Sequence, residues 1–379
     1  MTIVKENAPH IRRKATVNRM MIDVLIALAP TLIFSFIVYP LITLLHYVVS
    51  MAIMIGSEFV YVGLKNMMPK TDEKHTFKEK FLYAYKGHYD LTNVITPAIT
   101  AVIFTLIMPA GAPIYAIIIG ALVAIWFGKL VFGGLGSNIF NPAAVGMLFA
   151  KLCFGSQYQT NVQTWYYTIP DTAAGATPLG LLSGGDFSFQ YSMFDLFFGR
   201  IPGTLGEVYK ITILIGLIYL LIRRSADFRI VASYLGTFIF LSFVAGLSLY
   251  GISNEIYGAA SAVNPFTFTL YSLLTGGVLF GATFMLTDPV TSPINSPSRI
   301  IYGMVAAVAT VFIRLFAALP EGVGFSILIA NMVACVLDHY EWSNPRYTYK
   351  MFIAMGCLVV IPALITFLAI YYGGVYYVR

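Results

Sequence analysis

The sequence has few charged residues. Lys, Arg, Asp and Glu make up 11% of its 379 residues, and 58% of the residues are hydrophobic. Soluble domains carry about 25% charged residues, and a soluble core cannot bury so much apolar surface. The composition therefore excludes a soluble globular domain. It predicts an all-α polytopic membrane protein, whose apolar helices are covered by lipid.

Cysteine is also scarce. Cys153, Cys335 and Cys357 stand alone in apolar segments, and no two of them have the spacing of metal ligands. The chain is therefore not expected to build an iron–sulfur cluster or a structural disulfide by itself, and we predict no metal site. The run GGLG at 133–136 lacks the lysine and the strand–turn–helix setting of a nucleotide-binding loop. We predict no catalytic residue in the chain.

Long apolar runs account for most of the sequence. A helix needs about 20 apolar residues to cross a bilayer. We predict eleven spans, several of them short or interrupted by Gly and Pro, at 20–40, 42–64, 94–109, 113–132, 141–155, 208–222, 230–250, 266–286, 300–318, 323–338 and 351–372. The first run lacks the small-residue cleavage site of a signal peptide, so we expect it to stay as a span.

The positive charges fall unevenly on the two sides of these spans. If the N-terminus lies in the cytoplasm and the spans alternate, 18 of the 23 lysines and arginines lie on the cytoplasmic side. Short cytoplasmic loops are enriched in Lys and Arg, so the sequence predicts the N-terminus inside and the C-terminus outside. The distribution of the positive charges that make up the net charge of +6 therefore indicates the membrane orientation, and we expect no nucleic-acid partner. The polar loop 156–206 falls on the outer side.

Two parts of the chain look alike. FGKLVFGGLG at 127–136 and FIRLFAALPEG at 312–322 each place a lone cation, Lys129 or Arg314, after an aromatic residue and before a breaker segment. We predict an inverted repeat of five plus five helices with one extra C-terminal span, an arrangement that often holds a site between its halves. The predicted divisions are a tail at 1–19, repeats at 20–155 and 208–338, an outer loop at 156–207 and a C-terminal part at 339–379.

Ionisable residues inside spans are costly in a membrane and are candidates for function. Our candidates within the predicted spans are Asp23, His46, Glu58, Lys129, Arg314 and Asp338. Several stand near span ends, where a partner or snorkelling to the interface would also satisfy them. For Glu58 and His46, the simpler alternative to a functional role is that each joins two helices.

Two stretches combine helix breakers with polar residues at membrane depth, GGLGSNIFNPAAVG at 133–146 and TDPVTSP at 287–293. Irregular backbone is tolerated there only where protein buries it or where it lines a polar cavity. Asn141 and Asp288 each precede a proline, which is typical of a helix start. A structural kink without a ligand is the alternative, because membrane helices use Gly and Pro freely.

The outer loop contains the small-residue stretch DTAAGATPLG at 171–180. Its Thr177 is not an obvious nucleophile, because no His, Cys or Lys stands near it in the sequence to act as its base. If Thr177 is modified, another protein must supply the catalysis. A Gly-Ala-Thr triplet also arises by chance, so the triplet alone means little.

Several stretches together resemble the D-type membrane component of Rnf complexes, which couple ferredoxin:NAD+ oxidoreduction to ion transport. The resemblance runs from residue 9 to about residue 340. It rests on PHIRRKATVNRMMIDVLIALAP, FGKLVFGGLGSNIFNPAAVG, DTAAGATPL, IPGTLGE, FGATFMLTDPVTSP and LPEGVGFSILIANMVACVLDH. The B-type component of the sodium-pumping NADH:quinone oxidoreductase is a sister family. The PHIR start and the DPVTSP loop favour Rnf.

The resemblance implies that Thr177 carries FMN, joined through its phosphate to the hydroxyl by a separate flavin transferase. Asp171, Gly175 and Ala176 match the attachment pattern of the family. Ala174 departs from it, because Ser or Thr commonly stands at that position.

The resemblance also implies a second, non-covalent flavin, riboflavin, held between the membrane halves. Our candidates for its pocket are the breaker residues Asn141, Asp288, Thr291 and Ser292.

The function implied by the resemblance is that of a flavoprotein subunit, inactive alone, in an ion-translocating oxidoreductase of the bacterial inner membrane. It would carry electrons between ferredoxin and NAD+ and support transport of Na+ or H+. Its expected partners are Rnf proteins of the A, B, C, E and G types and membrane lipid. The alternatives are the B-type component of a quinone reductase, a channel or transporter for a small polar solute, and a scaffold protein of the complex.

Overall fold

The computed structural model describes residues 17–67, 77–158, 177–183, 189, 191–201, 203–257, 263–317, 321–339 and 346–373. Within these ranges the regular structure is helical, with one isolated β-bridge between Pro109 and Thr204. The predicted attachment residues Asp171, Gly175 and Ala176 lie outside the described residues.

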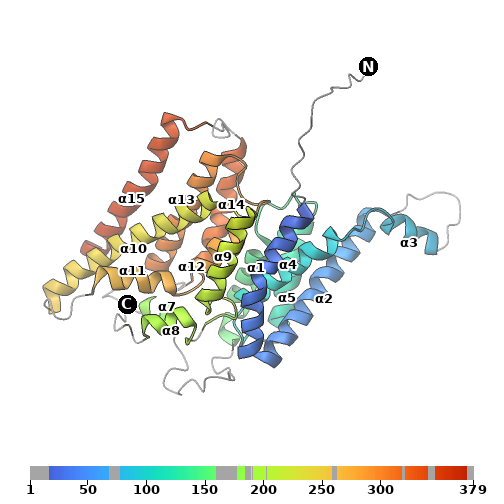
Figure 1. The fold of residues 1–379 in the computed structure, drawn as a ribbon, viewed down its shortest axis with the longest axis horizontal. Coiled ribbons are helices and arrows are strands. Elements are labelled where there is room, and N and C mark those ends of the chain that lie inside the picture. Colours follow the sequence, from blue (N-terminus) through green and yellow to red (C-terminus); the bar gives the residue numbers. More distant parts are fainter. Residues whose placement is uncertain are drawn as a thin grey trace.

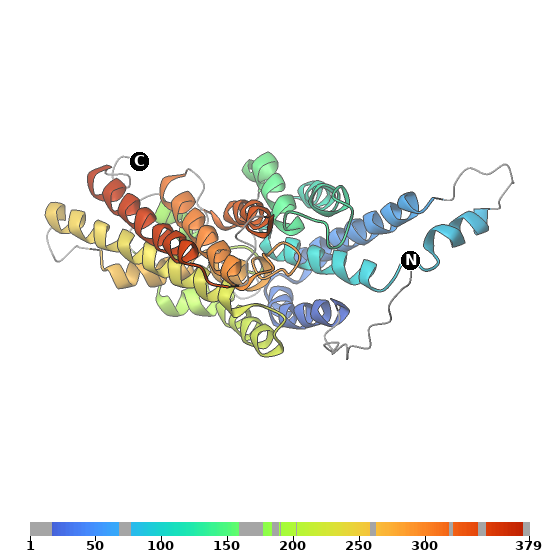
Figure 2. The ribbon, with the colours of Figure 1, turned by 90° about the horizontal axis from the view of Figure 1, so that it is seen from above.

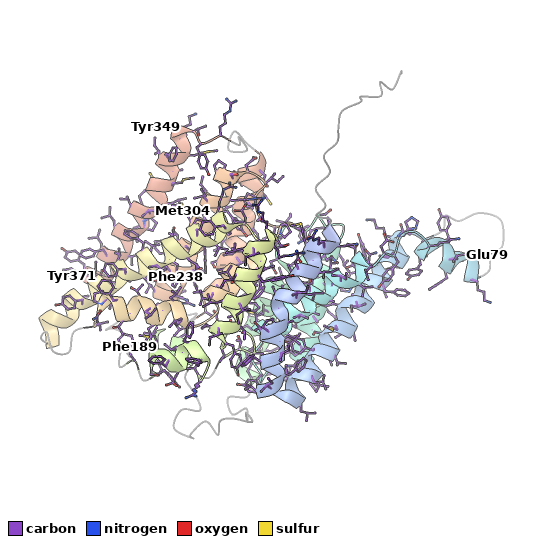
Figure 3. The ribbon with its side chains drawn as sticks, in the orientation of Figure 1. Glu79, Phe189, Phe238, Met304, Tyr349 and Tyr371 are labelled. Atoms are coloured by element: carbon purple, nitrogen blue, oxygen red, sulfur yellow. The ribbon has the colours of Figure 1, made fainter. Side chains whose placement is uncertain are left out.

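The first half of the chain forms one group of helices. It contains α1 (Val17–Val38), α2 (Pro40–Lys65), α4 (Thr92–Ile107), α5 (Ile114–Ile125), which continues into the π-helical turn η1 (Trp126–Leu130), and α6 (Pro142–Phe154). Helix α2 packs on α4 and α5, and α5 packs on α6. The short helix α3 (Phe77–Tyr85), which carries Glu79, projects from this group (Figures 1 and 3).

The second half forms another group. It contains α10 (Phe228–Tyr257), α11 (Pro265–Leu274), α12 (Val278–Phe280) with the π-helical turn η5 (Gly281–Met285), α13 (Ser296–Phe316), α14 (Val323–His339) and α15 (Tyr349–Gly373). Helix α10 packs on α11 and α13, and α13 packs on α14. Helix α15 lies along α10 and α13 at the edge of the group (Figures 1 and 2).

The two groups meet at two helix pairs. Helix α9 (Lys210–Arg223) lies against α1, and α14 lies against α6. A Cβ atom at Gly216 of α9 would lie 2.7 Å from the carbonyl oxygen of Ala27, so glycine is required for this approach. Thr31 and Thr212 add a buried hydrogen bond of 3.1 Å between the same helices. Small residues and hydroxyl groups commonly join membrane helices in this way.

Five helices are long and apolar enough to cross a membrane singly: α1, α2, α10, α13 and α15. Helix α11 and the α12–η5 segment pass the same test as one span with a bend of 61°. Helices occupy the other predicted spans too, but each has at most 17 residues. Such a helix is about 25 Å long, which is less than the ~30 Å hydrocarbon core. The chain is a multi-pass membrane protein in which short helices accompany the full spans.

The helix ends gather at two ends of the bundle. Helix α1 begins, α9 ends, and α10 and α13 begin at one of them, which we name the α1-start end. Helices α7 (Pro178–Ser183) and α8 (Met193–Phe198) lie at the opposite end, low in Figure 1. Helix α1 ends and α9 begins there, with the rings of Phe34 and Tyr209 5.3 Å apart. Thr177 directly precedes α7 and so lies opposite the α1-start end.

Candidate functional site

The break between α11 and α12 is surrounded by buried charged side chains. A break inside a membrane span leaves backbone carbonyl and amide groups without helical partners. Arg314 donates hydrogen bonds to the carbonyl oxygens of Ser272, at 2.9 Å, and Thr275, at 3.2 Å. Lys210 donates to the carbonyl oxygen of Gly276 at 2.8 Å. Two cations therefore satisfy the C-terminal end of α11, where the helix dipole is negative.

Two carboxylates lie on the other side of this break. Glu321 accepts a hydrogen bond of 3.0 Å from the N–H of Gly277, and a Cβ atom on Gly277 would lie 2.7 Å from Oε1 of Glu207. Burial and the charge of Glu321 raise the pKa of Glu207 to about 8. Burial acts on Glu321 in the same direction, but Lys151 and Arg314 outweigh it and lower the pKa of Glu321. Burial therefore favours the neutral form of Glu207, and the nearby cations favour the charged form of Glu321.

We expect the thermal stability of the detergent-solubilised protein to fall as the pH rises from about 5 to 8. The pKa of Glu207 is raised in the fold, so the stabilisation by its proton is complete below the pKa of the unfolded chain and is lost through about pH 8. One such group changes the free energy of unfolding by at most about 1.4 kcal/mol per pH unit. Glu207→Gln keeps the neutral form and should flatten the fall, whereas Glu79→Gln on exposed α3 should not. An unaltered profile in Glu207→Gln would contradict this assignment.

Arg314 was predicted from the sequence as a candidate, but Glu207, Lys210 and Glu321 were not. Glu207 and Glu321 each stand beside a glycine at the edge of an apolar run, in IPGTLGE and LPEGVG. That context was the available signal, but nothing local shows that the residues meet at one helix break.

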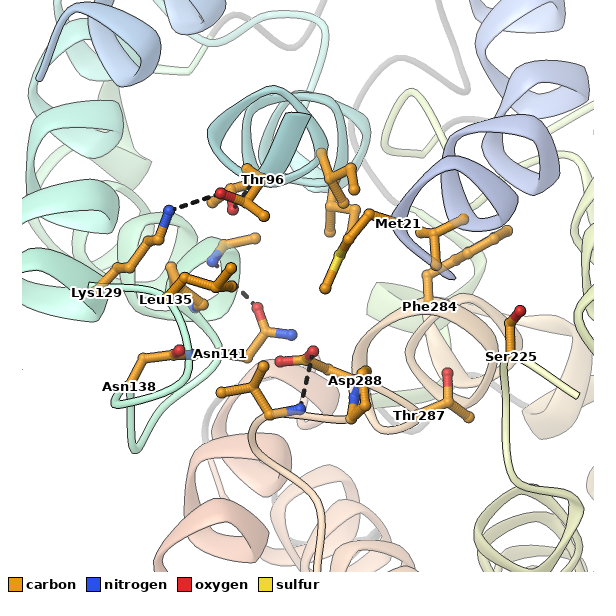
Figure 4. Close-up of a pocket in the computed structure, with 18 of the residues that line it drawn as sticks. Met21, Thr96, Lys129, Leu135, Asn138, Asn141, Ser225, Phe284, Thr287 and Asp288 are labelled. Atoms are coloured by element: carbon orange, nitrogen blue, oxygen red, sulfur yellow. Dashed lines mark hydrogen bonds between the residues drawn. The ribbon is translucent and has the colours of Figure 1, made fainter. Parts of the chain in front are cut away.

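A cavity of about 80 Å³ lies between the two groups of helices (Figure 4). Asn141 and Asp288, two of the predicted pocket residues, line it together with Lys129. Asn141 caps the N-terminus of α6, and its side-chain oxygen accepts from the N–H groups of Ala143, at 3.1 Å, and Ala144, at 3.4 Å. This is the helix start that an Asn before a Pro predicts.

Asn331 of α14 joins the two groups beside this cavity. The N–H of Asn141 donates to Oδ1 of Asn331 at 3.0 Å, and Nδ2 of Asn331 donates to the hydroxyl of Tyr302 at 2.9 Å and to the carbonyl of Thr291 at 3.4 Å. Nδ2 of Asn141 donates to the carbonyl of Met285 at 3.3 Å. The network is buried, so each broken bond leaves a polar group without water. Asn331 was not predicted from the sequence, although a lone Asn in an apolar span was a signal.

Asn331→Ala should lower the free energy of unfolding by about 1–3 kcal/mol, because it leaves the buried N–H of Asn141 without an acceptor. Cys335 is exposed one turn further along the same helix, so Cys335→Ala is the matched control and should leave the stability nearly unchanged. Thermal unfolding of both variants in the same detergent measures the difference. Equal stability of the two variants would mean that the network does not hold the halves together.

Asp288 does not begin a helix, so this prediction was wrong. Helix α13 begins at Ser296. Asp288 instead closes a turn, in which its carboxylate accepts from the N–H of Val290 at 3.3 Å and from the hydroxyl of Thr291 at 3.1 Å. Asp before Pro forms such a turn as readily as a cap. Thr291 is buried beside Asp288, and Ser292 lines a separate cleft at the α1-start end.

Lys129 forms a buried ion pair with Glu58. Its Nζ lies 2.9 Å from Oε2 of Glu58 and 2.9 Å from the hydroxyl of Thr96 (Figure 4 draws the Thr96 bond). The side chains of Lys129 and Glu58 are 3% and 5% exposed, so the pair is almost completely shielded from water. Asp23 and Asp338 have partners too, Arg223 and the N–H of Ile294. The alternative that partners satisfy these charges therefore fits Asp23, Lys129, Arg314 and Asp338. Glu58 fits its own alternative, because its pair with Lys129 joins α2 to η1.

Thr177 is exposed, and its hydroxyl oxygen accepts a hydrogen bond of 3.1 Å from the N–H of Gly180. Leu179, two residues after Thr177, lies close to Gly276 at the break of the bent span. A Cβ atom added to Gly276 would lie 2.8 Å from Cδ2 of Leu179. Leu179 and Arg314 also line one small pocket. The helix that follows Thr177 is thus packed over the charged break.

The fold and these sites define a class of protein: a multi-pass membrane protein with interrupted helices and buried charges at the interruptions. The chain belongs to the NQR2, RnfD, RnfE family, whose model matches residues 4–346.

Two kinds of relatives confirm the resemblance predicted from the sequence. The chain is 28% identical over 342 residues to the D component of the Na(+)-translocating ferredoxin:NAD(+) oxidoreductase complex of Acetobacterium woodii, a match that covers 90% of this chain and 94% of the relative. It is 35% identical over 248 residues to the B component of the Na(+)-translocating NADH-quinone reductase of Chromohalobacter salexigens, a match that covers 64% of this chain and 57% of the relative. The corresponding protein of Ectopseudomonas mendocina matches similarly, at 35% over 249 residues. The chain thus spans little more than half the length of these two quinone reductase proteins.

Proposed function

We propose that the chain is the D-type membrane component of an Rnf-type complex, which moves electrons between ferredoxin and NAD+ and couples them to translocation of Na+ or H+. The match to the D component of Acetobacterium woodii over 94% of its length carries this proposal. The B-type component of a quinone reductase is the second candidate, and the higher identity of 35% favours it. In either complex the chain would work only with other subunits.

In this proposal Thr177 carries FMN through a phosphoester made by a separate flavin transferase. The exposed hydroxyl of Thr177 fits this attachment, since an outside enzyme can reach it. Asp171, Gly175 and Ala176 complete the attachment pattern in the sequence. Bound FMN would supply one-electron exchange with neighbouring carriers, and the protein would supply its position and electrostatics. The packing of α7 over the α11–α12 break supports a fixed position for the group.

The cavity between the halves is too small to hold riboflavin. Its volume is about 80 Å³, whereas ligand pockets are roughly 300–1,000 Å³. The amide of Asn141 and the carboxylate of Asp288 are suitable polar partners for a flavin edge, but the space beside them is too small. No step of the proposed function is therefore assigned to a riboflavin at this place.

We also infer that the two groups of helices are an inverted repeat. In this repeat α1 corresponds to α9, α2 to α10, α5 to α13 and α6 to α14, and α4 corresponds to the bent span formed by α11, α12 and η5. Matching contacts support this correspondence: α2 packs on α4 and α5 as α10 packs on α11 and α13, and α5 packs on α6 as α13 packs on α14. Lys129 and Arg314, the matching cations of the sequence, lie near the ends of corresponding helices. The charge asymmetry favours a cytoplasmic α1-start end and an outer Thr177 in a bacterial inner membrane.

The test is purification of the chain from its own membrane in mild detergent. We expect Rnf proteins of the A, B, C, E and G types to accompany it, together with ferredoxin-dependent NAD+ reduction that drives Na+ or H+ uptake into vesicles. Quinone reductase proteins in their place would support the second candidate. A solitary chain that transports a small polar solute without redox activity would contradict both.

A further inference from the structure

A cleft of about 660 Å³ opens at the α1-start end of the bundle, between the end of α9 and the starts of α10 and α13. Its volume falls in the range of roughly 300–1,000 Å³ that is usual for ligand pockets. Among the described residues that line it, Arg224, Arg229 and Arg299 are basic and Asp227 is the one carboxylate. We name this the arginine cleft.

The charges in the arginine cleft do not balance. Asp227 forms ion pairs with two guanidinium groups. Arg299 pairs with its Oδ2 atom, and Nη1 of Arg229 lies 3.8 Å from the same oxygen. No ion pair within the described ranges involves Arg224, whose side chain is exposed. Three arginines and one aspartate leave two positive charges in excess. An anion is therefore the ligand that the cleft favours.

Two of the arginines are held in place by further hydrogen bonds. Nη1 of Arg229 donates to the hydroxyl of Ser296 at 2.7 Å, and Nε of Arg299 donates to the carbonyl of Pro293 at 2.8 Å. Their side chains are nevertheless 47% and 30% exposed. Part of each guanidinium group is thus fixed by the protein, and the remaining N–H groups are open to a ligand. Planar, pre-oriented N–H pairs of this kind suit the oxygens of a phosphate.

The helix ends add to the positive potential of the cleft. Helices α10 and α13 have 30 and 21 residues, and both begin beside it, at Phe228 and Ser296. The N-terminus of a helix carries a partial positive charge of about half a unit. Asp227 caps the first of these ends by accepting from the N–H of Arg229 at 2.8 Å. That hydrogen bond occupies one oxygen of Asp227, so less of its charge is left to neutralise the arginines.

The cleft also has an apolar rim. Phe228 lines the cleft and is 67% exposed. Ile222, which follows the lining residue Leu221 in the sequence, is 75% exposed, and Ile294, two residues after the lining residue Ser292, is 76% exposed. Cations next to exposed apolar side chains at the end of a helix bundle are typical of the boundary between lipid headgroups and acyl chains. A soluble anion would use the arginines but not this rim. An acidic protein would meet the same rim without gaining from burial of acyl chains.

We propose that the arginine cleft binds the phosphate headgroup of an anionic membrane phospholipid. The headgroup lies among Arg224, Arg229 and Arg299, and an acyl chain runs past Phe228. Ser225, Thr287 and Pro289 line both this cleft and the cavity between the halves. A bound lipid would therefore cover the approach to that cavity from the α1-start end.

The test measures lipid binding to the purified full chain in detergent by native mass spectrometry. Phosphatidylglycerol is the probe, and phosphatidylcholine, whose headgroup has no net charge, is the comparison. Arg224→Gln and Arg229→Gln should each weaken phosphatidylglycerol binding about fivefold, and the double variant about 25-fold, from roughly 1 kcal/mol per basic residue and tenfold per 1.4 kcal/mol. Arg200→Gln removes an exposed arginine two residues after the end of α8, at the opposite end, and should change the affinity less than twofold.

Three results would overturn the proposal. The first is a double variant that binds phosphatidylglycerol as tightly as the unaltered chain. The second is displacement of the lipid by millimolar inorganic phosphate, which would assign the cleft to a soluble anion. The third is a double variant that keeps its lipid affinity but no longer retains a protein partner on purification, which would make the cleft a protein docking surface.

Discussion

Replacing Thr177 by alanine should abolish the covalently bound flavin fluorescence of the protein in a denaturing gel. Alanine has no hydroxyl group that could form the phosphoester. Within the described residues the Thr177 hydroxyl accepts one hydrogen bond, from the N–H of Gly180, so the change affects one exposed helix start. The loss of such a cap costs about 0.5–2 kcal/mol, which a multi-pass bundle tolerates. The fluorescence should therefore disappear while the protein still elutes as a folded species.

Two control variants separate attachment from folding in this experiment. Thr172→Ala changes a neighbouring threonine of the same stretch and should keep the fluorescence, and Thr177→Ser retains a hydroxyl group at the attachment position. Fluorescence that persists in Thr177→Ala would refute the attachment site. An unaltered protein without covalent flavin would favour the transporter alternative. Normal electron transfer by a complex that contains Thr177→Ala would point to a scaffold role.

Lys129→Met should destabilise the protein by about 3–5 kcal/mol. The change leaves Glu58 as a charge that is 5% exposed and has lost an ammonium group 2.9 Å away. Removing one partner of a buried ion pair costs this much because the remaining charge is neither hydrated nor paired. The variant should show a strongly lowered melting temperature in detergent, and less of it should accumulate in the membrane.

The double variant Glu58→Leu with Lys129→Met gives the sharper result. Apolar replacements of both partners are often close to neutral in stability, so the double variant should recover most of the loss. Lys78→Met on the exposed helix α3 removes a charge of the same sign and should have an effect within about 0.5 kcal/mol. Equal destabilisation of the single and double variants would show that the two side chains do not depend on each other.

Local sequence chemistry predicted some elements correctly and failed at others. The apolar runs predicted the helices because the length and hydropathy of a run are properties of the run itself. Asn141 was predicted as a helix start because an Asn and a following Pro act within one turn. The same rule failed at Asp288. There the carboxylate accepts hydrogen bonds from Val290 and Thr291, and these close a turn instead of starting a helix. A local pattern that suits two backbone conformations does not choose between them.

The local sequence pattern did not predict the number of full spans either. Apolar composition marks eleven segments, but within the described ranges five helices reach the length of a span singly and one more does so as a bent pair. Proline begins and glycine ends α6, whereas α9 is followed by Arg224 in a left-handed conformation. Whether a short apolar helix forms part of a span depends on the helices that cover its ends.

The sequence by itself determined that this chain is a helical membrane protein of its family and that Thr177 stands in an attachment-like stretch. These conclusions rest on composition and on neighbouring residues. The tertiary structure alone decided which distant groups meet. Asn331 bonds to Asn141 across 190 positions of the chain, and Glu207, Lys210, Arg314 and Glu321 converge on one helix break. Hydrophobic runs are local, whereas the partner of a buried polar group is set by the packing of whole helices.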